Sequence, residues 1–237
     1  MSIKVVLFDL DGTLLPMDQE VFVKAYFGAL AKMLAPFGYE SQKLVQTIWG
    51  GTVAMVKNDG TRTNEEAFWE AFLSVYGEQA RNDMPKFDRF YEEDFDREVQ
   101  PSCGFNPLSR PTVEAIKEMG LRVVLATNPI FPAVATKSRM KWAGLTPEMF
   151  ELYTTFENSN HCKPSLEYYK DILNKLGVEA QDCLMVGNDV GEDMIAEELG
   201  MKVFLLTADL INKHSKDISM YPQGDLSDLL EYIKKIK

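Results

Sequence analysis

The chain has 237 residues, of which 25 are Lys or Arg and 36 are Asp or Glu, so its formal net charge is −11. This acidity excludes a broad basic surface for nucleic acid, because such binding needs Lys and Arg side chains that neutralise phosphates. The hydrophobic share of 46% and the charged share of 26% are typical of a globular protein with one large domain, or with one domain that carries a smaller inserted one.

We expect neither a membrane span nor a signal peptide. No run of about 18 apolar residues occurs, and the apolar part of MSIKVVLFDLDGT is short and leads straight into acidic residues. Cys103, Cys162 and Cys183 are widely spaced, form no CxxC pair and are joined by only two histidines, so they predict neither disulfides nor a zinc site. Reduced thiols in a cytoplasmic protein are the expectation.

Four short apolar segments predict strands of a parallel sheet, because nearly continuous β-branched apolarity is typical of strands buried on both faces. They are residues 3–8 (IKVVLF), 121–126 (LRVVLA), 183–186 (CLMV) and 202–206 (KVFLL), with 151–156 (ELYTTF) as a weaker candidate. Helices between them, marked by Pro near their starts or Gly at their ends, are predicted over residues 112–119, 165–176 and 192–199. This alternation predicts an α/β fold with a Rossmann-like parallel sheet.

Residues 17–105 contain no comparable strand and predict an inserted helical block. Apolar residues recur there at helical spacing, at positions 21, 22, 25, 26, 29, 30, 33 and 37, at 68, 72 and 76, and at 87, 90, 91 and 95. Thr63 and Glu66 form a capping-box pattern that begins the second of these groups. We interpret the aromatic residues as packing, and the Gly-, Pro- and Ser-rich flanks 12–18 and 101–111 as hinges.

Acidic side chains gather at the carboxyl ends of the predicted strands, where open α/β sheets bind ligands. Asp9 and Asp11 follow the first strand, and Asp189 and Asp193 follow the segment 183–186. Residues two apart at a strand end face the same side, so Asp9 and Asp11 are expected to turn toward one cavity. Carboxylates gathered there repel each other, and an oxygen-coordinated cation such as Mg²⁺ relieves the repulsion. An acidic surface turn is the alternative for DLDG taken alone.

Three further residues supply groups that suit phosphoryl transfer. Thr127 contributes a hydroxyl and Asn128 a backbone N–H after the second strand, where they can bind an oxyanion. Lys163, just before a helix, adds a compact positive charge that can hold both a nucleophile and a phosphate. Taken singly, Thr127 is a local hydrogen-bonding residue and Lys163 a solvated surface charge. Their order and placement together favour a site.

In this order the motifs resemble those of the haloacid dehalogenase (HAD) superfamily. The resemblance rests on DLDGT at 9–13, Thr127 at a strand end, Lys163-Pro164 opening a helix, and GNDVGED at 187–193. Residues 1–15 and 108–237 resemble the HAD catalytic core, and residues 16–107 resemble the helical cap domain that many members carry. The resemblance therefore implies a HAD fold whose parallel-sheet core carries an inserted all-helical cap.

The resemblance also implies a role for each motif residue. Asp9 would be the nucleophile that forms an aspartyl-phosphate, and Asp11 would be the general acid and base. Thr127 with Asn128 would bind phosphate oxygens, and Lys163 would stabilise the nucleophile and the phosphate. Mg²⁺ would be held by the Asp9 carboxylate, the Asp11 backbone carbonyl and a residue of the acidic motif.

The last motif departs from the family's common pattern, which places Asp directly after the strand-end Gly. Asn188 holds that place here and Asp189 follows it, and the family tolerates both spacings to Asp193. Either Asn188 or Asp189 could therefore be the metal ligand, and the negative charge of Asp189 favours Asp189. Asp193 is expected to have a supporting role at the site.

Asp11 favours a phosphatase over a dehalogenase, because an alkoxide leaving group needs a proton and a halide does not. The sequence thus predicts a Mg²⁺-dependent phosphatase of a small phosphorylated metabolite, while a sugar-phosphate mutase and a catalytically silent HAD scaffold stay open. A receiver-like phosphorylation module is disfavoured, because receivers are shorter, lack a helical insert and carry their phosphorylated Asp on a middle strand.

Substrate specificity is expected to reside in the helical insert, because the 36 residues between the second and third motifs (163 − 127 = 36) leave no room for a second cap. Closure of the insert over the core would exclude water and complete the site. Within it, Trp49-Gly50-Gly51 predicts a turn, and Lys57 and Arg62 predict solvated charges, with substrate contacts as the alternative. The sequence leaves the substrate and the oligomeric state open.

Overall fold

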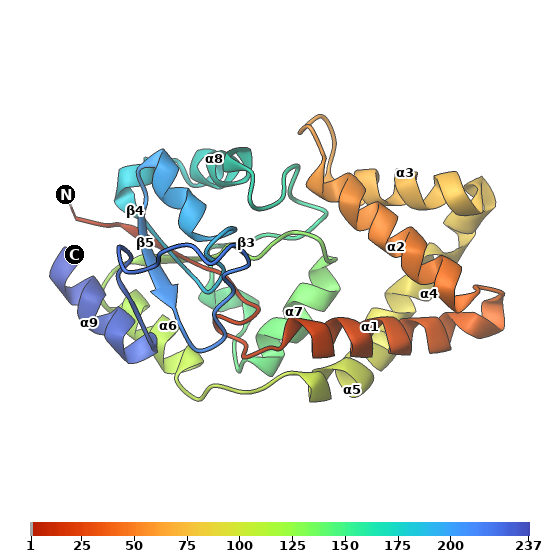
Figure 1. Ribbon diagram of the computed structural model, residues 1–237, viewed down its shortest axis with the longest axis horizontal. Coiled ribbons are helices and arrows are strands. Elements are labelled where there is room, and N and C mark those ends of the chain that lie inside the picture. The colour runs from red at the N-terminus through yellow and green to blue at the C-terminus, as the bar shows by residue number, and fades with distance from the viewer. Residues whose placement is uncertain (1) are drawn as a thin grey trace.

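A computed structural model describes residues 2–237 as a parallel sheet flanked by helices, with a group of helices packed beside it (Figure 1). Six strands are hydrogen-bonded in the order β3–β2–β1–β4–β5–β6, and all neighbours are parallel. The strands are β1 (Val5–Phe8), β2 (Arg122–Leu125), β3 (Leu152–Tyr153), β4 (Cys183–Gly187), β5 (Lys202–Leu206) and β6 (Gln223–Gly224).

The middle of the sheet is made of the strands that the sequence predicts. Every residue of β1 and β4 is buried, as continuous apolarity requires when helices cover both faces. Along β1, Val6 and Phe8 pack into one hydrophobic core, whereas Val5 and Leu7 pack into a second core on the other face. The predicted α/β fold with a parallel sheet is confirmed.

The edge strands are short and their sequence signals are weak. β3 keeps only two residues of the candidate segment 151–156, and β6 has no apolar run that would predict it. The strand order reverses at β1, with β2 and β3 on one side and β4, β5 and β6 on the other. Such a reversal opens a crevice at the carboxyl ends of β1 and β4, where open α/β sheets bind their ligands.

Nine α-helices accompany the sheet within residues 2–237. They are α1 (Gln19–Leu34), α2 (Ser41–Val56), α3 (Asn64–Tyr76), α4 (Met84–Arg89), α5 (Phe95–Val99), α6 (Ser109–Glu118), α7 (Ala133–Trp142), α8 (Leu166–Leu176) and α9 (Leu226–Ile236). Short 3-10 helices lie at Ala35–Phe37, Glu78–Asp83, Gln100–Ser102, Pro147–Met149, Ala180–Asp182 and Met194–Leu199, and a π-helical turn lies at Phe90–Asp94.

The inserted block is helical, as the sequence predicts, and α3 begins with the predicted capping box of Thr63 and Glu66. Figure 1 shows α1 to α4 gathered at one end of the molecule, and the sheet with α6, α8, α9 and both chain termini at the other. The division of the chain into a core (1–15 and 108–237) and a cap (16–107) stays a prediction.

Two local predictions need correction. Trp49-Gly50-Gly51 is not a turn but part of α2, where a side chain at Gly51 would collide with Phe68 of α3, so the glycine lets the two helices approach closely. The segment predicted as a helix over 192–199 begins later, as the 3-10 helix Met194–Leu199. The helix begins late because residues 190–193 form a turn, in which the backbone N–H of Asp189 donates a hydrogen bond to the carboxylate of Asp193.

None of the helices within residues 2–237 is by itself long and apolar enough to cross a membrane. Gln19–Phe37 and Ser41–Val56 meet that test of length and composition only as a pair, across a bend of 119°.

Candidate functional site

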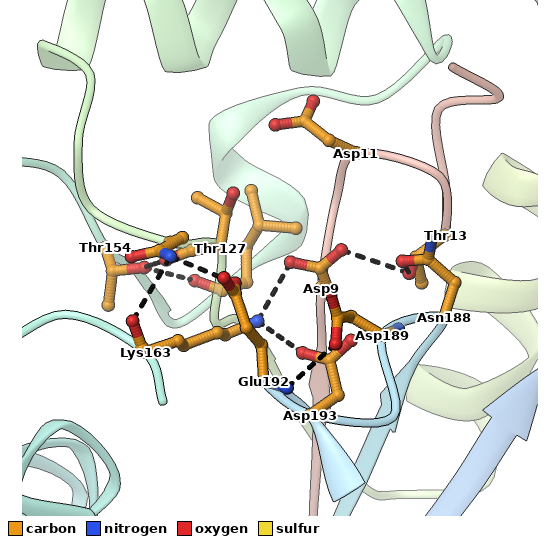
Figure 2. Close-up of polar contacts among 12 residues, drawn as sticks. Asp9, Asp11, Thr13, Thr127, Thr154, Lys163, Asn188, Asp189, Glu192 and Asp193 are labelled. Carbon is orange, nitrogen blue, oxygen red and sulfur yellow. Dashed lines mark hydrogen bonds and ion pairs between the residues drawn. The ribbon is translucent and has the colours of Figure 1, made fainter. Parts of the chain in front are cut away.

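The predicted site residues converge at one edge of the sheet. Phe8, the last residue of β1, is in register with Leu125 of β2 and with Val186 of β4. The residues that follow these strands therefore emerge side by side, and they include Asp9, Thr127 and Asn188 (Figure 2). Lys163 reaches the same place from the segment before α8, and its side chain is buried.

Lys163 joins two carboxylates in a buried ion-pair network (Figure 2). Its Nζ lies 2.9 Å from Asp9 Oδ1 and 2.6 Å from Asp193 Oδ1. Burial alone would lower the pKa of Lys163, but the charges of Asp193 and Asp9 raise it well above its usual value. Burial raises the pKa of Asp193, and the charge of Lys163 opposes that rise. The lysine is therefore a permanent cation beside Asp9.

The second oxygen of Asp9 is oriented by Thr13. The Thr13 hydroxyl lies 3.1 Å from Asp9 Oδ2 and 3.0 Å from Asn188 Oδ1, so it connects the turn after β1 with the loop after β4. Gly12 makes this turn feasible, because its φ is +81° and a Cβ there would collide with the Asn188 amide. Thr13 therefore fixes the orientation of the nucleophile candidate.

The acidic motif after β4 is a tight loop built on its own carboxylates. Asp189 Oδ1 accepts hydrogen bonds from the backbone N–H groups of Gly191, at 2.7 Å, and Glu192, at 3.0 Å. Asp193 Oδ2 accepts one from the Asp189 N–H at 3.0 Å. A side chain at Gly187 would collide with the Asp193 carboxylate. Asp193 therefore acts as a support for Lys163 and for the loop.

The donors at this edge fit a hard cation such as Mg²⁺. Within residues 2–237, no three His, Cys, Asp or Glu side chains form a ready-made metal cluster. Mg²⁺ does not need one, since it commonly binds one or two carboxylates and takes its other ligands from water and phosphate. Asp9 and Asp189 offer carboxylate oxygens, and both line the same cavity.

Asn188 and Asp189 differ in how many of their side-chain atoms already form hydrogen bonds. Asn188 Oδ1 lies against the Thr13 hydroxyl, and Asn188 Nδ2 donates to the backbone carbonyl of Asp209 at 2.6 Å. Asp189 uses only Oδ1 for its loop, and Oδ2 takes part in no hydrogen bond among the described residues. Asp189 is therefore the freer oxygen donor of the two.

Thr127 and Asn128 occupy the end of β2 beside Lys163. The Thr127 carbonyl accepts hydrogen bonds from the hydroxyls of Thr154, at 2.6 Å, and Tyr168, at 2.9 Å, which fixes the chain there. Asn128 Nδ2 donates to Glu192 Oε2 at 3.0 Å, and its buried Oδ1 has no partner among the described residues. Both Thr127 and Asn128 line the cavity, as expected of groups that could bind phosphate oxygens.

Asp11 lines the same cavity as Asp9, as the sequence predicts, but its carboxylate does not join the Asp9–Lys163–Asp193 cluster. Its carboxylate stands apart from the cluster in Figure 2 and forms an ion pair with Arg139 of α7, whose side chain is only 1% exposed. The sequence could not reveal this pairing, because Arg139 is a single cation within a helix and lies 128 positions from Asp11. Burial raises the pKa of Asp11 to about 6; Arg139 opposes the rise and Asp9 adds to it.

A cavity of about 650 Å³ adjoins the cluster. Asp9, Asp11, Thr127 and Asn128 form its wall at the sheet edge, and side chains of α1, α2 and α3 form the opposite wall. The sequence motifs therefore locate one end of the cavity. The sequence did not identify Arg139, Thr154 and Tyr168, which hold the motif residues in place, because each belongs to no motif. It also assigned no role to Glu192, which lies inside the last motif and binds Asn128.

The chain is similar to known proteins over most of its length. A model of the family described as haloacid dehalogenase-like hydrolase matches residues 3–209. Pyrophosphatase PpaX of Halalkalibacterium halodurans is 22% identical over 97% of this chain and 98% of that protein. The glyceraldehyde 3-phosphate phosphatase of Methanocaldococcus jannaschii is 28% identical, over 55% of this chain and 57% of that protein.

A solved structure of a 2-haloacid dehalogenase from Pseudomonas syringae pv. Tomato DC3000 has a TM-score of 0.66 with this chain. It is 21% identical over 98% of this chain and 99% of that one, so this likeness establishes the fold alone. With the family match over residues 3–209 and its motif residues gathered at one sheet edge, this chain belongs to the haloacid dehalogenase-like hydrolases.

Proposed function

We propose that this hydrolase is a Mg²⁺-dependent phosphatase that cleaves a small phosphate monoester through an aspartyl-phosphate on Asp9. The observation that carries the proposal is the 2.9 Å ion pair of Asp9 with Lys163, at the wall of a cavity that Asp11 also lines. A carboxylate fixed beside a buried cation is an oriented nucleophile. A nearby carboxyl group with a pKa of about 6 can carry the proton that a leaving alkoxide needs.

The reaction would proceed in two steps. In the first, a carboxylate oxygen of Asp9 attacks phosphorus, the bond from phosphorus to the alcohol oxygen breaks, and Asp11 gives its proton to that oxygen. In the second, Asp11 takes a proton from a water molecule as the water attacks the phosphorus of the aspartyl-phosphate. Inorganic phosphate then leaves and the Asp9 carboxylate is restored.

The remaining residues would bind and orient the phosphate. Lys163 offsets negative charge on Asp9 and on the phosphate, and Thr127 with Asn128 donates hydrogen bonds to phosphate oxygens. Mg²⁺, when bound, neutralises further charge on these oxygens. Asp9, the Asp11 backbone carbonyl and Asp189 would hold it.

Two considerations favour a phosphatase over a dehalogenase. Two curated relatives are named as a phosphatase and a pyrophosphatase, whereas the similarity to the dehalogenase structure concerns the fold. A dehalogenase also has no need of an acid at position 11, because a halide leaves without a proton. We further propose that residues 16–107 act as a cap that closes over the site and excludes water.

A phosphate-release assay tests the proposal. The panel contains para-nitrophenyl phosphate, glyceraldehyde 3-phosphate, pyrophosphate and several alkyl phosphates, each with and without Mg²⁺. We expect Mg²⁺-dependent release that Asp9→Asn abolishes and that the exposed control Asp217→Asn retains. Release that survives both Asp9→Asn and removal of the metal would sink the proposal, and conversion of a sugar phosphate to its isomer without release would indicate a mutase.

A further inference from the structure

Much of the cavity wall is aromatic. Phe22 and Phe27 of α1, Trp49 of α2 and Phe68 of α3 line it, and Phe131 and Phe156 join them from the loops after β2 and β3. The cavity volume of about 650 Å³ falls within the range of about 300–1,000 Å³ that holds drug-sized ligands. The space exceeds what a phosphate group alone requires.

Part of this apolar surface is exposed. Trp49 is 47% exposed and Val56 is 46% exposed, although both are large apolar residues on α2, and both line the cavity. Phe22 and Phe156 of the same wall are buried, and Phe27, Phe68 and Phe131 are half-buried. Apolar side chains that stay exposed inside a cavity next to a reactive group are typical of a surface that a ligand covers.

The charges of the cavity disfavour an anionic substituent on that ligand. Glu65, Asp88 and Glu157 also line it, and Lys213 is the one basic side chain among the described lining residues. Burial raises the pKa of Glu65, and the nearby charges of Glu157 and Asp88 raise it further. Burial and the charges of Glu92 and Glu157 likewise raise the pKa of Asp88. A carboxylate or second phosphate would therefore meet repulsion here.

We infer that the substrate is the phosphate monoester of an uncharged, largely apolar alcohol, whose apolar group lies against Trp49, Phe27 and Phe68 while its phosphate lies at Asp9. This inference rests on the proposed phosphatase function and adds the class of leaving group. Substrates that carry a second anionic group are excluded by this inference. Such a group would need cationic side chains, whereas the cavity wall is acidic and aromatic.

Three esters of primary alcohols test the inference with the intact protein and Mg²⁺. They are 2-phenylethyl phosphate, 2-hydroxyethyl phosphate and phosphoglycolate, all of which need a proton for the leaving oxygen. We expect kcat/KM for 2-phenylethyl phosphate to exceed that for 2-hydroxyethyl phosphate by about tenfold or more. Phosphoglycolate should be the poorest of the three substrates.

Two variants on α2 form a matched pair. Val56 lines the cavity, whereas Val53 is equally exposed, at 47%, but lies outside it. Val56→Ser should lower kcat/KM for 2-phenylethyl phosphate about threefold or more, and Val53→Ser should leave it unchanged. Trp49→Ala should lower the same value about tenfold and change that of 2-hydroxyethyl phosphate less than twofold. The partial exposure of all three residues keeps the cost to folding small.

The outcomes distinguish a failure of the proposed leaving group from a failure of the proposed phosphatase function. Asp9-dependent hydrolysis of phosphoglycolate or 2-hydroxyethyl phosphate that is faster than that of 2-phenylethyl phosphate overturns the inference and leaves the phosphatase intact. Equal effects of Val56→Ser and Val53→Ser overturn it as well. If none of the esters is hydrolysed in an Asp9-dependent manner, the proposed function fails and the inference fails with it.

Discussion

Arg139 holds the carboxylate of Asp11 from a buried position on α7. Its guanidinium lies 4.6 Å from the centre of the Phe131 ring, and its Nη2 lies 3.4 Å from the Thr136 hydroxyl. The arginine is thus fixed on several sides, and Asp11 is its one anionic partner among the described residues. The general-acid candidate is therefore anchored by a residue outside every motif.

Removal of Arg139 should destabilise the protein, because it leaves the Asp11 carboxylate largely buried without its cation. We expect Arg139→Met to lower the free energy of unfolding by about 3 kcal/mol, measured by urea denaturation at pH 7.5. The double variant Arg139→Met/Asp11→Asn should regain part of this loss, since it removes both charges. Strictly additive losses from the two substitutions would contradict a direct coupling between these residues.

The protonation of Asp11 should be visible in the pH dependence of activity with alkyl phosphates. Its pKa is raised to about 6, so the acid form that protonates the alkoxide is lost as the pH rises above about 6. We expect kcat/KM to fall there in the wild type more steeply than in Asp11→Asn. The ionisation of the substrate near pH 6 is common to both enzymes, so the difference between the two profiles isolates Asp11. Parallel profiles would remove Asp11 from the role of acid.

Lys163 should matter to both folding and activity, because it neutralises two buried carboxylates. We expect Lys163→Met to lower the free energy of unfolding by about 3–5 kcal/mol and to reduce phosphate release by about a hundredfold or more. Lys170→Met, on the exposed face of α8 with a surface pair to Glu167, provides the control and should change stability by less than about 1 kcal/mol. Equal behaviour of the two variants would contradict the buried role of Lys163.

The metal ligand can be assigned by comparing Asn188 with Asp189. Chelation of metal should abolish phosphate release, and added Mg²⁺ should restore it. Asp189→Asn should raise the Mg²⁺ concentration for half-maximal activity about 10–100-fold. Asn188→Ala should instead lower thermal stability, because the Asn188 amide connects Thr13 with the backbone of Asp209. If Asn188→Ala has the larger effect on the Mg²⁺ requirement, Asn188 and not Asp189 is the metal ligand.

The sequence predicted the middle of the sheet because continuous apolarity has few other interpretations. It predicted the convergence of Asp9, Thr127 and Asn188 because parallel strands end at the same edge. It missed β6, whose two residues are not apolar, and it misread Trp49-Gly50-Gly51, where helix packing outweighs the preference of glycine for turns.

The residues that position the motif side chains could not be predicted from sequence patterns. Arg139 belongs to no motif and contacts a residue 128 positions away. Glu192 lies in the motif GNDVGED, but the motif does not reveal its contact with Asn128, 64 positions away. The spacing of the aromatic residues in the insert predicts packing, and Phe72, which is fully buried and does not line the cavity, packs as predicted. Only the tertiary arrangement distinguishes those that face the cavity, such as Trp49.

The central claim is that Asp9 becomes phosphorylated, and a single-turnover experiment tests it most directly. Asp11→Asn should still accept phosphate from para-nitrophenyl phosphate, whose leaving group needs little protonation, but should hydrolyse the intermediate slowly. We expect a burst of about one para-nitrophenolate per protein molecule. Acid-quenched protein should then carry a hydroxylamine-sensitive phosphate on the peptide that contains Asp9. Release of para-nitrophenolate with no labelled protein, or with the label on another residue, would contradict the account.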